Sequence, residues 1–245
     1  MNADSPLYLH YKNRLSQSPV FSELSDEILS DMLGRFQHTT WRKGTGAGAA
    51  SLLQRFYLII DGRLRMERID SVSGKRITLF LLGPGDGFDV ISLLDGQPHE
   101  ATSIALDDMS LLSTSTEAVR EWINRHPEFN RKFLPYLGER MRKMEALATD
   151  LATKDTITRL ARLILHHTAP DPSSMSKSHP VRLIHDLSHD SLAHMIGSTR
   201  QVVNQHLQAL RHKGILDNQS RHLVVKELEA LKQQAETFLS HDHRT

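Results

Sequence analysis

The sequence has 245 residues, enough for about two domains, and its 39% hydrophobic and 24% charged residues are those of an ordinary globular protein. A formal net charge of +1 excludes a uniformly basic surface, so any surface that binds a polyanion must be local. The absence of Cys excludes disulfides, cysteine catalysis and iron–sulfur clusters held by thiolates. Without a run of about 18 apolar residues or an apolar signal-peptide core, we expect a cytoplasmic protein with no membrane partner.

The N-terminal half changes from helical to strand-like patterning. Residues 1–20 are polar and are predicted to form a mobile arm. Phe21–Phe36 has apolar residues at helical spacing with Ser25 as a cap, which predicts a short amphipathic helix. Short strands separated by turn signals follow, and they predict a small antiparallel roll or barrel within residues 21–126. The predicted strands are Phe56–Ile60, Arg63–Ile69, Arg76–Leu82, Glu100–Leu106 and Ser110–Thr114. Because Trp41–Gln54 is rich in Gly and Ala, it is expected to be an irregular edge.

A long helix is predicted over Glu128–Thr153, after a short helix at Glu117–Arg125 that stops near Pro127. Apolar residues recur along it at steps of three and four, as in a heptad seam. They are Leu134, Leu137, Met141, Met144, Ala148 and Leu151. The seam favours pairing with a second copy of the helix, and the alternative is packing on its own roll. Residues 127–153 are therefore predicted to be a dimerisation helix.

The rest of the chain, residues 154–245, reads as a second domain. Asp155 is placed to cap a helix, and turn signals at Asn218–Ser220 separate two short apolar runs that predict a β-hairpin wing. Ala169–Pro180 is rich in Pro and Ser and is predicted to be a loop. The other predicted elements are a helix at Thr156–His167, strands at Val181–His185, Ile215–Leu216 and His222–Val225, and a helix at Glu227–Ser240.

The segment Ser188–Leu216 predicts two helices joined by a sharp turn. The apolar face of the first helix ends at Gly197, which can adopt the positive φ that such a turn often needs. Ser198 or Thr199 is placed to cap the second helix. In that helix the buried stripe is Val203, Leu207 and Leu210. This arrangement is typical of a helix-turn-helix.

The opposite face of the second helix carries side chains suited to reading bases. Its residues are Arg200, Gln201, Asn204, Gln205 and Gln208. Arg can bond guanine in a bidentate way, and Gln or Asn can bond adenine. Between Ser191 and Leu216 the sequence has no Asp or Glu that would repel phosphate. A surface helix of a bundle would normally carry Glu as freely as Gln, so double-stranded DNA is the predicted partner.

The order of roll, long helix and winged helix-turn-helix resembles the CRP/FNR family of bacterial transcription regulators. The resemblance runs over roughly residues 20–228, and its strongest segments are YLIIDGRLRM (57–66), LLGPGDGF (81–88) and DSLAHMIGSTRQVVNQHLQAL (190–210). It implies an α+β protein with a cyclic-nucleotide-binding-like roll, acting as an allosteric homodimer on a pseudo-palindromic DNA site. It also implies contact with RNA polymerase through Ala169–Pro180 and the turn at Asp95–Gln97. No catalytic activity is expected.

In the family, the recognition helix starts Arg-Glu and has a second Arg four residues after the Glu. Here the matching residues are Arg200, Gln201 and Gln205, which implies a half-site different from the TGTGA-type consensus. Further candidates for phosphate and neighbouring contacts are Ser198, Thr199, Asn204, His206, Gln208, Arg211 and Lys213.

The effector positions of cyclic-AMP receptors in the family depart from the pattern. Their Gly-Glu and Arg-Ser pairs correspond to Asp89-Val90 and Glu100-Ala101, and the Thr-Ser of the dimer helix corresponds to Met144-Glu145. Phe88 precedes the first of these pairs. Two carboxylates near a phosphate would oppose it by about 1–4 kcal/mol. We therefore expect no binding of cAMP in the family's manner and an unidentified signal, or, if the carboxylates are surface charges, a closed pocket and a constitutive regulator.

Three alternatives remain open at the sequence level. A haem-based gas sensor of the same family would need a ligand such as His99 or His38, because Asp89 and Ile91 occupy the usual ligand positions. A ligand-binding module without DNA activity would keep the roll but would not need Arg200. A His-based metalloenzyme is the third, but pairs such as His185 and His189 have no third ligand fixed by the sequence, so no metal site is expected.

Overall fold

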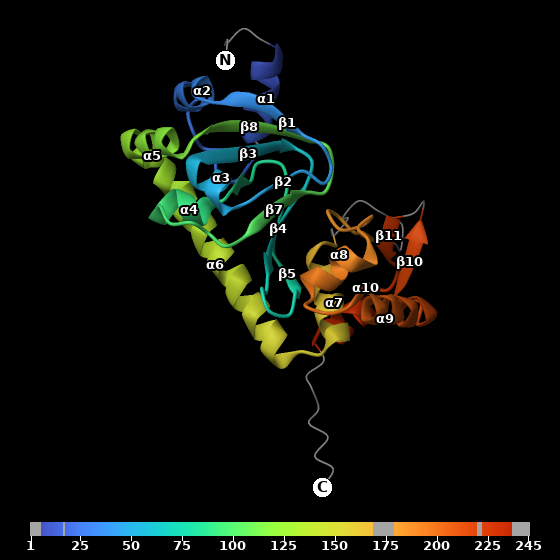
Figure 1. The fold of residues 1–245 in the computed structure, drawn as a ribbon. Helices are drawn as coiled ribbons and strands as arrows, with labels where there is room; N and C mark the ends of the chain where they lie inside the picture. Colours follow the sequence, from blue (N-terminus) through green and yellow to red (C-terminus); the bar gives the residue numbers. More distant parts are fainter. Residues whose placement is uncertain (1–5, 17, 169–178, 220–221, 237–245) are drawn as a thin grey trace. The chain divides into compact units, whose positions relative to one another are not determined.

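The computed structural model describes residues 6–16, 18–168, 179–219 and 222–236 (Figure 1). The chain divides into two compact units. One contains the residues up to Gly74 together with Leu79–Lys143, and the other contains Lys75–Thr78 and the residues from Met144 onward.

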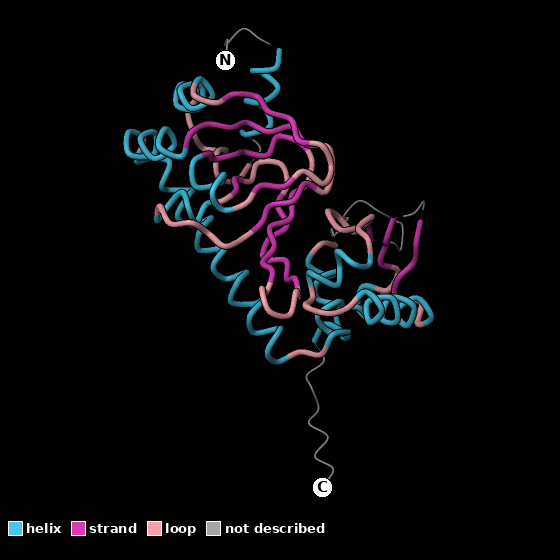
Figure 2. The backbone as a smooth tube through the Cα atoms, in the orientation of Figure 1, coloured by secondary structure: helices cyan, strands magenta, loops and turns pink. Residues whose placement is uncertain are grey.

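The roll consists of two antiparallel sheets, as the sequence predicts (Figure 2). One has the strand order β1-β8-β3-β6 and the other β2-β7-β4-β5. The first sheet uses β1 (Gln37–Trp41), β8 (Met109–Ser115), β3 (Arg55–Asp61) and β6 (Gly87–Phe88). The second uses β2 (Gly46–Ala47), β7 (Thr102–Ala105), β4 (Leu64–Ile69) and β5 (Arg76–Leu82).

Strand β3 separates two hydrophobic cores because its side chains alternate between the two faces of the sheet. Tyr57 and Ile59 lie in the core between the sheets, whereas Phe56 and Leu58 lie in the core under the covering helices. Figure 1 shows α1 (Pro6–Ser16), α2 (Asp26–Gly34) and α5 (Thr116–Arg125) around the β1-β8-β3 sheet. A short 3₁₀ turn, η1 (Pro127–Phe129), joins α5 to the long helix.

The predicted N-terminal arm is wrong for residues 6–16. Helix α1 lies there, and its Tyr8, Tyr11 and Leu15 are buried in the core under the helices. Helix α2 confirms the predicted amphipathic helix, and the Ser25 hydroxyl accepts a hydrogen bond from the backbone N–H of Ile28. The arm reads as polar because aromatic residues that carry a hydroxyl score low in hydropathy while burying large rings.

Two short helices were missed by the sequence analysis. Helix α3 (Ala49–Gln54) occupies part of the stretch predicted to be an irregular edge, where Ala, Leu and Gln are good helix formers. Helix α4 (Val90–Asp95) follows β6 and ends at Gly96, which has a φ of 72°. A left-handed glycine is a common helix stop.

The long helix α6 covers Asn130–Thr153 without a break. On its surface Leu134 and Met141, one heptad apart, are 62% and 73% exposed. Leu137, on the neighbouring seam position, packs partly against the core under the helices. Exposed large apolar side chains in register are typical of a helix that pairs with another.

The second unit contains the winged helix-turn-helix. Its helices are α7 (Thr156–His166), α8 (His189–Met195), α9 (Arg200–His212) and α10 (Leu228–Glu236). Its sheet has the order β10-β11-β9, from β10 (Leu216–Gln219), β11 (His222–Val225) and β9 (His179–Pro180). The predicted Asp155 cap and the wing hairpin are confirmed. With the roll and the long helix, the predicted α+β architecture is confirmed.

The strand predicted at Val181–His185 is wrong. Pairing with β11 falls at His179–Pro180, and Val181 forms only an isolated bridge with Thr168. Leu183 has a φ of 58°, a left-handed conformation that does not continue a strand. The predicted loop at Ala169–Pro180 lies largely outside the described residues, as does the predicted extension of the last helix beyond residue 236.

Candidate nucleic-acid interface and effector site

The turn between α8 and α9 is built on one glycine. Gly197 has a φ of 60°, and a Cβ placed there would lie 2.7 Å from Leu151 Cδ2. The backbone conformation therefore favours glycine, as the sequence predicts, and a side chain there would also make the end of Leu151 shift. The Ser198 backbone N–H donates to the Ala193 carbonyl at 2.9 Å, which closes the turn.

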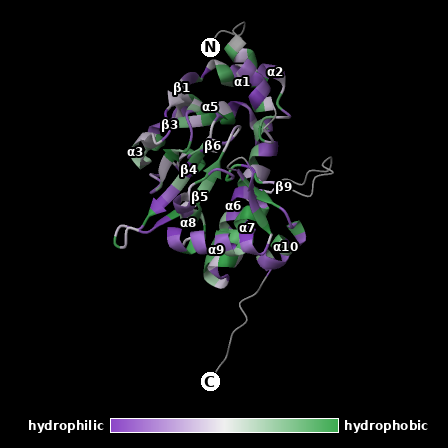
Figure 3. Cartoon of the chain, turned by 90° about the vertical axis from the view of Figure 1, so that its right-hand side faces the viewer, coloured by the Kyte–Doolittle hydropathy of each residue, from purple (hydrophilic) through white to green (hydrophobic). Residues whose placement is uncertain are grey.

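Helix α9 begins at an observed cap and buries the predicted stripe. The Thr199 hydroxyl accepts from the Val202 backbone N–H at 3.4 Å, so Thr199 is the cap of the two candidates. Val203, Leu207 and Leu210 are fully buried. Hydrophilic and hydrophobic residues alternate along α9 (Figure 3). Burial of one stripe orients the polar face outward.

The candidate DNA contacts lie on the free side of α9 and at its ends. Exposed positions are Thr199, Arg200, Gln201, Gln205, Gln208 and Lys213, and partly exposed positions are Ser198, Asn204 and Arg211. Arg211 donates from Nη2 to Asn218 Oδ1 at 3.2 Å, which ties the end of α9 to the wing.

His206, a predicted candidate for DNA contact, packs within its own unit instead. Its Nε2 lies 2.7 Å from Thr156 Oγ1, so the ring faces α7 within its own unit. Burial lowers the pKa of His206, and nearby Asp155 opposes that effect in part. The residue is a packing group of the helix-turn-helix, whose position between the polar and buried faces of α9 made it ambiguous in sequence.

The start of α8 lies in positive surroundings. Burial, followed by the charges of Arg211 and Arg200, lowers the pKa of His189. Two guanidinium groups therefore act on the first residue of α8, next to the free face of α9. A local concentration of cations is what phosphate binding needs when the net charge of the chain is only +1.

The predicted effector residues do not share one environment. Phe88 is fully buried in the roll, where its ring stacks on Tyr57 with centroids 5.0 Å apart and meets the edge of Trp41. Ala101 is buried in the same core. These rings fill the roll interior beside the positions that the family uses for cyclic nucleotides.

The two carboxylates of the predicted pocket are likewise separated by environment. Asp89 is buried, accepts from Ser92 Oγ at 2.5 Å, and lies 2.8 Å from His99 Nδ1. Glu100 is exposed and pairs with Arg68 at 2.6 Å. The expectation that both might be surface charges is therefore wrong for Asp89. Val90 and Met144 are partly buried, and Met144 lies in the part of α6 that belongs to the second unit.

These residues do not fit a cyclic nucleotide held in the family's manner. A cyclic phosphate is an anion, and the positions that would hold it present a buried carboxylate at Asp89 and an exposed one at Glu100. Asp89 pairs with His99 and Glu100 pairs with Arg68. The two negative charges therefore make a phosphate unfavourable at these positions.

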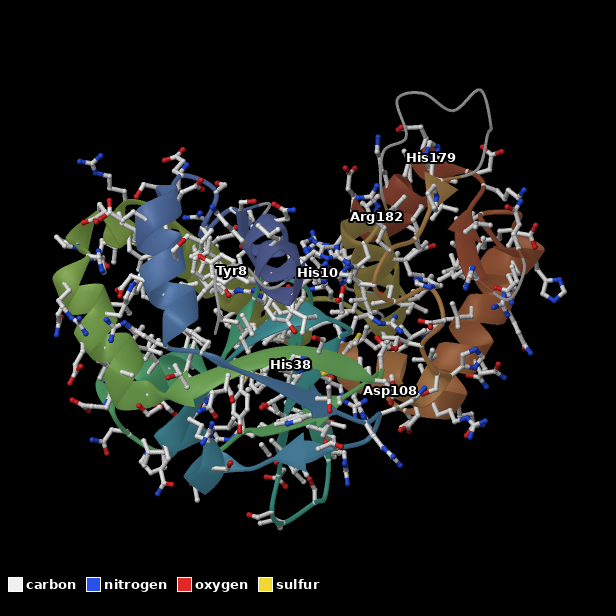
Figure 4. All side chains as sticks on the ribbon, turned by 90° about the horizontal axis from the view of Figure 1, so that it is seen from above. Tyr8, His10, His38, Asp108, His179 and Arg182 are labelled. Atoms are coloured by element: carbon white, nitrogen blue, oxygen red, sulfur yellow. The ribbon has the colours of Figure 1, made fainter. Side chains whose placement is uncertain are left out.

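The two histidines considered for haem differ. The Asp89 carboxylate holds His99 Nδ1 and so orients its ring, as carboxylates do for metal-binding histidines. His38, labelled in Figure 4, has Nε2 3.2 Å from Ser110 Oγ and stacks on Tyr11, so it is part of the packing between β1 and α1. Over the described residues, no group of three or more His, Asp or Glu side chains could hold a metal ion.

A link that was not predicted from the sequence joins the roll to the long helix. Asp86 precedes β6, and its Oδ1 accepts from Arg140 and, at 3.3 Å, from the Tyr136 hydroxyl. Arg140 lies over the Tyr136 ring, 4.8 Å from its centroid. Burial and then Asp86 raise the pKa of Tyr136 to about 12. The Gly83–Gly87 loop was visible in the sequence, but its partner 50 residues away was not.

Two family models match the chain, one in the roll and one in the helix-turn-helix, and the long helix α6 lies between the matched ranges. A Crp-like helix-turn-helix domain matches residues 158–234, and a cyclic nucleotide-binding domain matches residues 49–126. Within the described part of the chain, no helix is both long and apolar enough to span a membrane.

Relatives resemble the chain over nearly their whole length. A "CRP-like cAMP-activated global transcriptional regulator" of Mycobacterium tuberculosis is 23% identical over 222 residues, which cover 90% of this chain and 98% of the relative. A "Global nitrogen regulator" of Synechocystis is 28% identical over 221 residues, with 88% and 93% covered.

Solved structures share the fold. A variant of CooA from Carboxydothermus hydrogenoformans matches with a TM-score of 0.69 and 22% identity, over 87% of this chain and 98% of its own. The c-di-GMP-responsive regulator CLP of Xanthomonas campestris matches with a TM-score of 0.64 and 18% identity, over 82% and 99%.

Proposed function

Because this chain belongs to the CRP/FNR family of bacterial transcription regulators, we propose that it works as a homodimer that places one α9 in each half of a pseudo-palindromic DNA site. Membership makes the protein a DNA-binding regulator of transcription through its helix-turn-helix.

Base reading belongs to Arg200, Gln201 and Gln205. The observation that carries this assignment is the free face of α9, which begins at Arg200, is exposed at all three positions and follows a turn that Gly197 closes. Arg200 would bond guanine, and the two glutamines would bond adenine. Phosphate and neighbouring contacts fall to Ser198, Thr199, Asn204, Gln208 and Lys213.

Two copies of the chain pair through the seam of α6. Leu134, Met141 and Ala148 repeat at heptad spacing and are exposed in the single chain. Leu137 and Met144 are partly buried, and Leu151 lies against Gly197 of its own chain, so it has the least surface left for a partner. A second copy of α6 would cover the exposed seam, and two half-sites about 34 Å apart would follow.

DNA binding is controlled by a signal that the roll senses. The Asp86–Arg140 pair connects the loop before β6 to α6, so a ligand that favours one position of this loop would bias the long helix. The signal is not cAMP held in the family's manner. We further propose that RNA polymerase contacts the turn at Asp95–Gln97. We assign the protein to the cytoplasm, where its DNA partner lies, and we assign it no catalytic activity.

The experiment that tests the proposal is selection of genomic fragments by the purified full-length protein, followed by fluorescence anisotropy on the best fragment and a shuffled copy. We expect enrichment of a pseudo-palindrome and at least tenfold tighter binding to it than to the shuffled copy, since specific and non-specific affinities differ by 10³ or more in such proteins. Fragments without a shared sequence, bound no better than shuffled DNA, would overturn it.

Haem sensing is a second candidate, and the Asp89–His99 hydrogen bond is the observation that favours it. His99 Nε2 would be the iron ligand, and bound haem would supply the gas-binding iron. The visible spectrum of protein titrated with haemin tests this. A Soret band that shifts in His99→Ala but not in His38→Ala would support the candidate. A spectrum identical in both variants and the wild type would remove it.

A further inference from the structure

An apolar pocket lies under the helices that cover the roll, on the face of β3 opposite the ring-filled interior. The space between its walls is about 550 Å³, and part of that space is open solvent. The walls come from β3, α2, α5, the start of α6 and the loop before β6. Val90, one of the predicted effector positions, also lines it.

Aromatic side chains make up much of the wall. Phe129 stacks on Phe133 with centroids 4.9 Å apart, and Trp122 meets the face of Phe129 at 5.1 Å. Phe56 borders the pocket where Gly87 leaves it room, because a Cβ on Gly87 would lie 2.4 Å from Phe56 Cζ. A flat ring can pack against such walls better than a branched aliphatic chain.

One polar group in this lining lacks a partner. Trp122 is 2% exposed, and its indole Nε1–H donates to no acceptor among the described residues. A buried donor without a partner lowers stability because it has lost its hydrogen bond to water. An acceptor on a ligand would therefore form a favourable hydrogen bond with it.

The charge of the pocket points to a neutral occupant. Arg35 is the charged residue of the lining, and its guanidinium already donates to the Asp31 carboxylate at 3.0 Å. His126 lies 3.2 Å from the same carboxylate. An anionic ligand would meet no uncompensated cation in this lining and would lose its hydration.

We propose that this pocket binds a small uncharged aromatic molecule with one acceptor oxygen, which accepts a hydrogen bond from Trp122 Nε1. Tyr136 lines the pocket and also donates to Asp86, so an occupant contacts the link between the roll and α6. The pocket is thus an effector site. As a binding site it stands alone, and as an effector site it rests on the proposed function.

Three probes of similar size test the binding site by calorimetry on the full-length protein. They are acetophenone, ethylbenzene, which lacks the acceptor, and phenylacetate, which carries a charge. We expect acetophenone to bind about five- to tenfold more tightly than ethylbenzene, as one net hydrogen bond allows, and phenylacetate to bind most weakly. No binding of acetophenone, or tightest binding of phenylacetate, would overturn the assignment.

Variants locate the ligand. Trp122→Phe keeps a ring but removes the donor, and it should bring the acetophenone-to-ethylbenzene ratio to about one. Trp41→Phe removes the other tryptophan, in the roll interior, and should keep the wild-type ratio. Ala118→Phe fills the pocket from α5 and should abolish binding of both probes. A wild-type ratio in Trp122→Phe, or wild-type binding in Ala118→Phe with a cooperative melt, would place the ligand elsewhere.

The effector role has its own measurement. Saturating acetophenone should change the affinity of the protein for its selected DNA site at least threefold, and the change should vanish in Ala118→Phe. Unchanged DNA affinity with intact probe binding would overturn the effector role and leave the binding site standing. Failure to select any DNA would overturn the proposed function, and the calorimetric evidence for the binding site would still hold.

Discussion

His206 shows how one side chain on a DNA-reading helix can serve the fold instead. Its ring bonds Thr156 on α7, and burial holds its pKa below the ordinary value despite the nearby Asp155. The folded state therefore favours the neutral ring. In the unfolded chain the ring binds a proton near pH 6.5, so the stability this residue contributes is present above that pH and is lost as the pH falls.

The prediction is a pH-dependent melt. The melting temperature of the wild type should fall between about pH 7.5 and about pH 5.5. The melting temperature of His206→Gln should fall by less over the same interval. His212→Gln, at an exposed position of the same helix, controls for the loss of an imidazole. Thermal unfolding followed by circular dichroism measures all three. A loss in His206→Gln equal to that of the wild type would contradict the account.

Lys213 tests the other kind of residue on this surface. It follows the last turn of α9, is exposed, and is proposed to contact phosphate. Lys213→Ala should weaken binding to the selected and the shuffled DNA equally. It should also reduce the slope of log affinity against log salt concentration by about one. Anisotropy titrations over a range of salt concentrations measure this. A change confined to the selected site would mean that Lys213 reads sequence.

At the residue scale the sequence analysis succeeded where the requirement was local. The φ of Gly197 and the cap depend on neighbouring backbone: the φ is as predicted, and the cap is Thr199, one of the two predicted candidates. The inward ring of His206 and the burial of Asp89 depend on Thr156 and His99, which adjacent sequence does not reveal. Candidate residues on a helix margin therefore need a structure before they can be assigned to one face.

The long helix carries the prediction for pairing. Met141 is 73% exposed in the single chain, so Met141→Glu should leave the fold intact while placing a charge in the proposed seam. We expect monomers by light scattering at concentrations where the wild type is dimeric. Ala146→Glu introduces the same charge away from the seam and should remain dimeric. A dimeric Met141→Glu would move the interface off this seam.

The link between the loop before β6 and α6 carries a prediction for stability. Asp86→Ala removes the carboxylate that Arg140 and Tyr136 bond, and it should lower the free energy of unfolding by about 1–3 kcal/mol. Glu121→Ala breaks an exposed pair with Arg125 and should change it by less than about 0.5 kcal/mol. Urea unfolding distinguishes the two. Equal effects would mean that the Asp86 contacts do not stabilise the fold.

Elements with a strong period were predictable, and short ones were not. The bounds of β5 were predicted as observed, and the long helix differs only at its start. Helix α1 was missed because its buried residues include tyrosines, and β9 was misplaced because Leu183 adopts a left-handed conformation that sequence does not announce. The pocket under the helices was invisible because its walls come from distant segments.

In the whole molecule, the helix-turn-helix matches that of a DNA-binding regulator of the family, whereas the effector positions of the roll differ from the family's pattern. The helix-turn-helix keeps its cap, its turn and an acid-free outer face. The roll keeps its strands but fills its interior with Trp41, Tyr57 and Phe88. The helix-turn-helix thus has the family's architecture with Gln201 and Gln205 at two of the proposed base-reading positions, and the roll has an interior occupied by aromatic rings.

Arg200 is the residue of α9 to which we assign guanine reading. The most direct test compares the affinities of the wild type and Arg200→Ala for the selected site and its shuffled copy at one salt concentration. We expect Arg200→Ala to lose about 1–3 kcal/mol of binding free energy on the selected site and much less on the shuffled copy. An equal loss on both would show that Arg200 only contacts phosphate, and it would contradict the assignment of base reading to this face of α9.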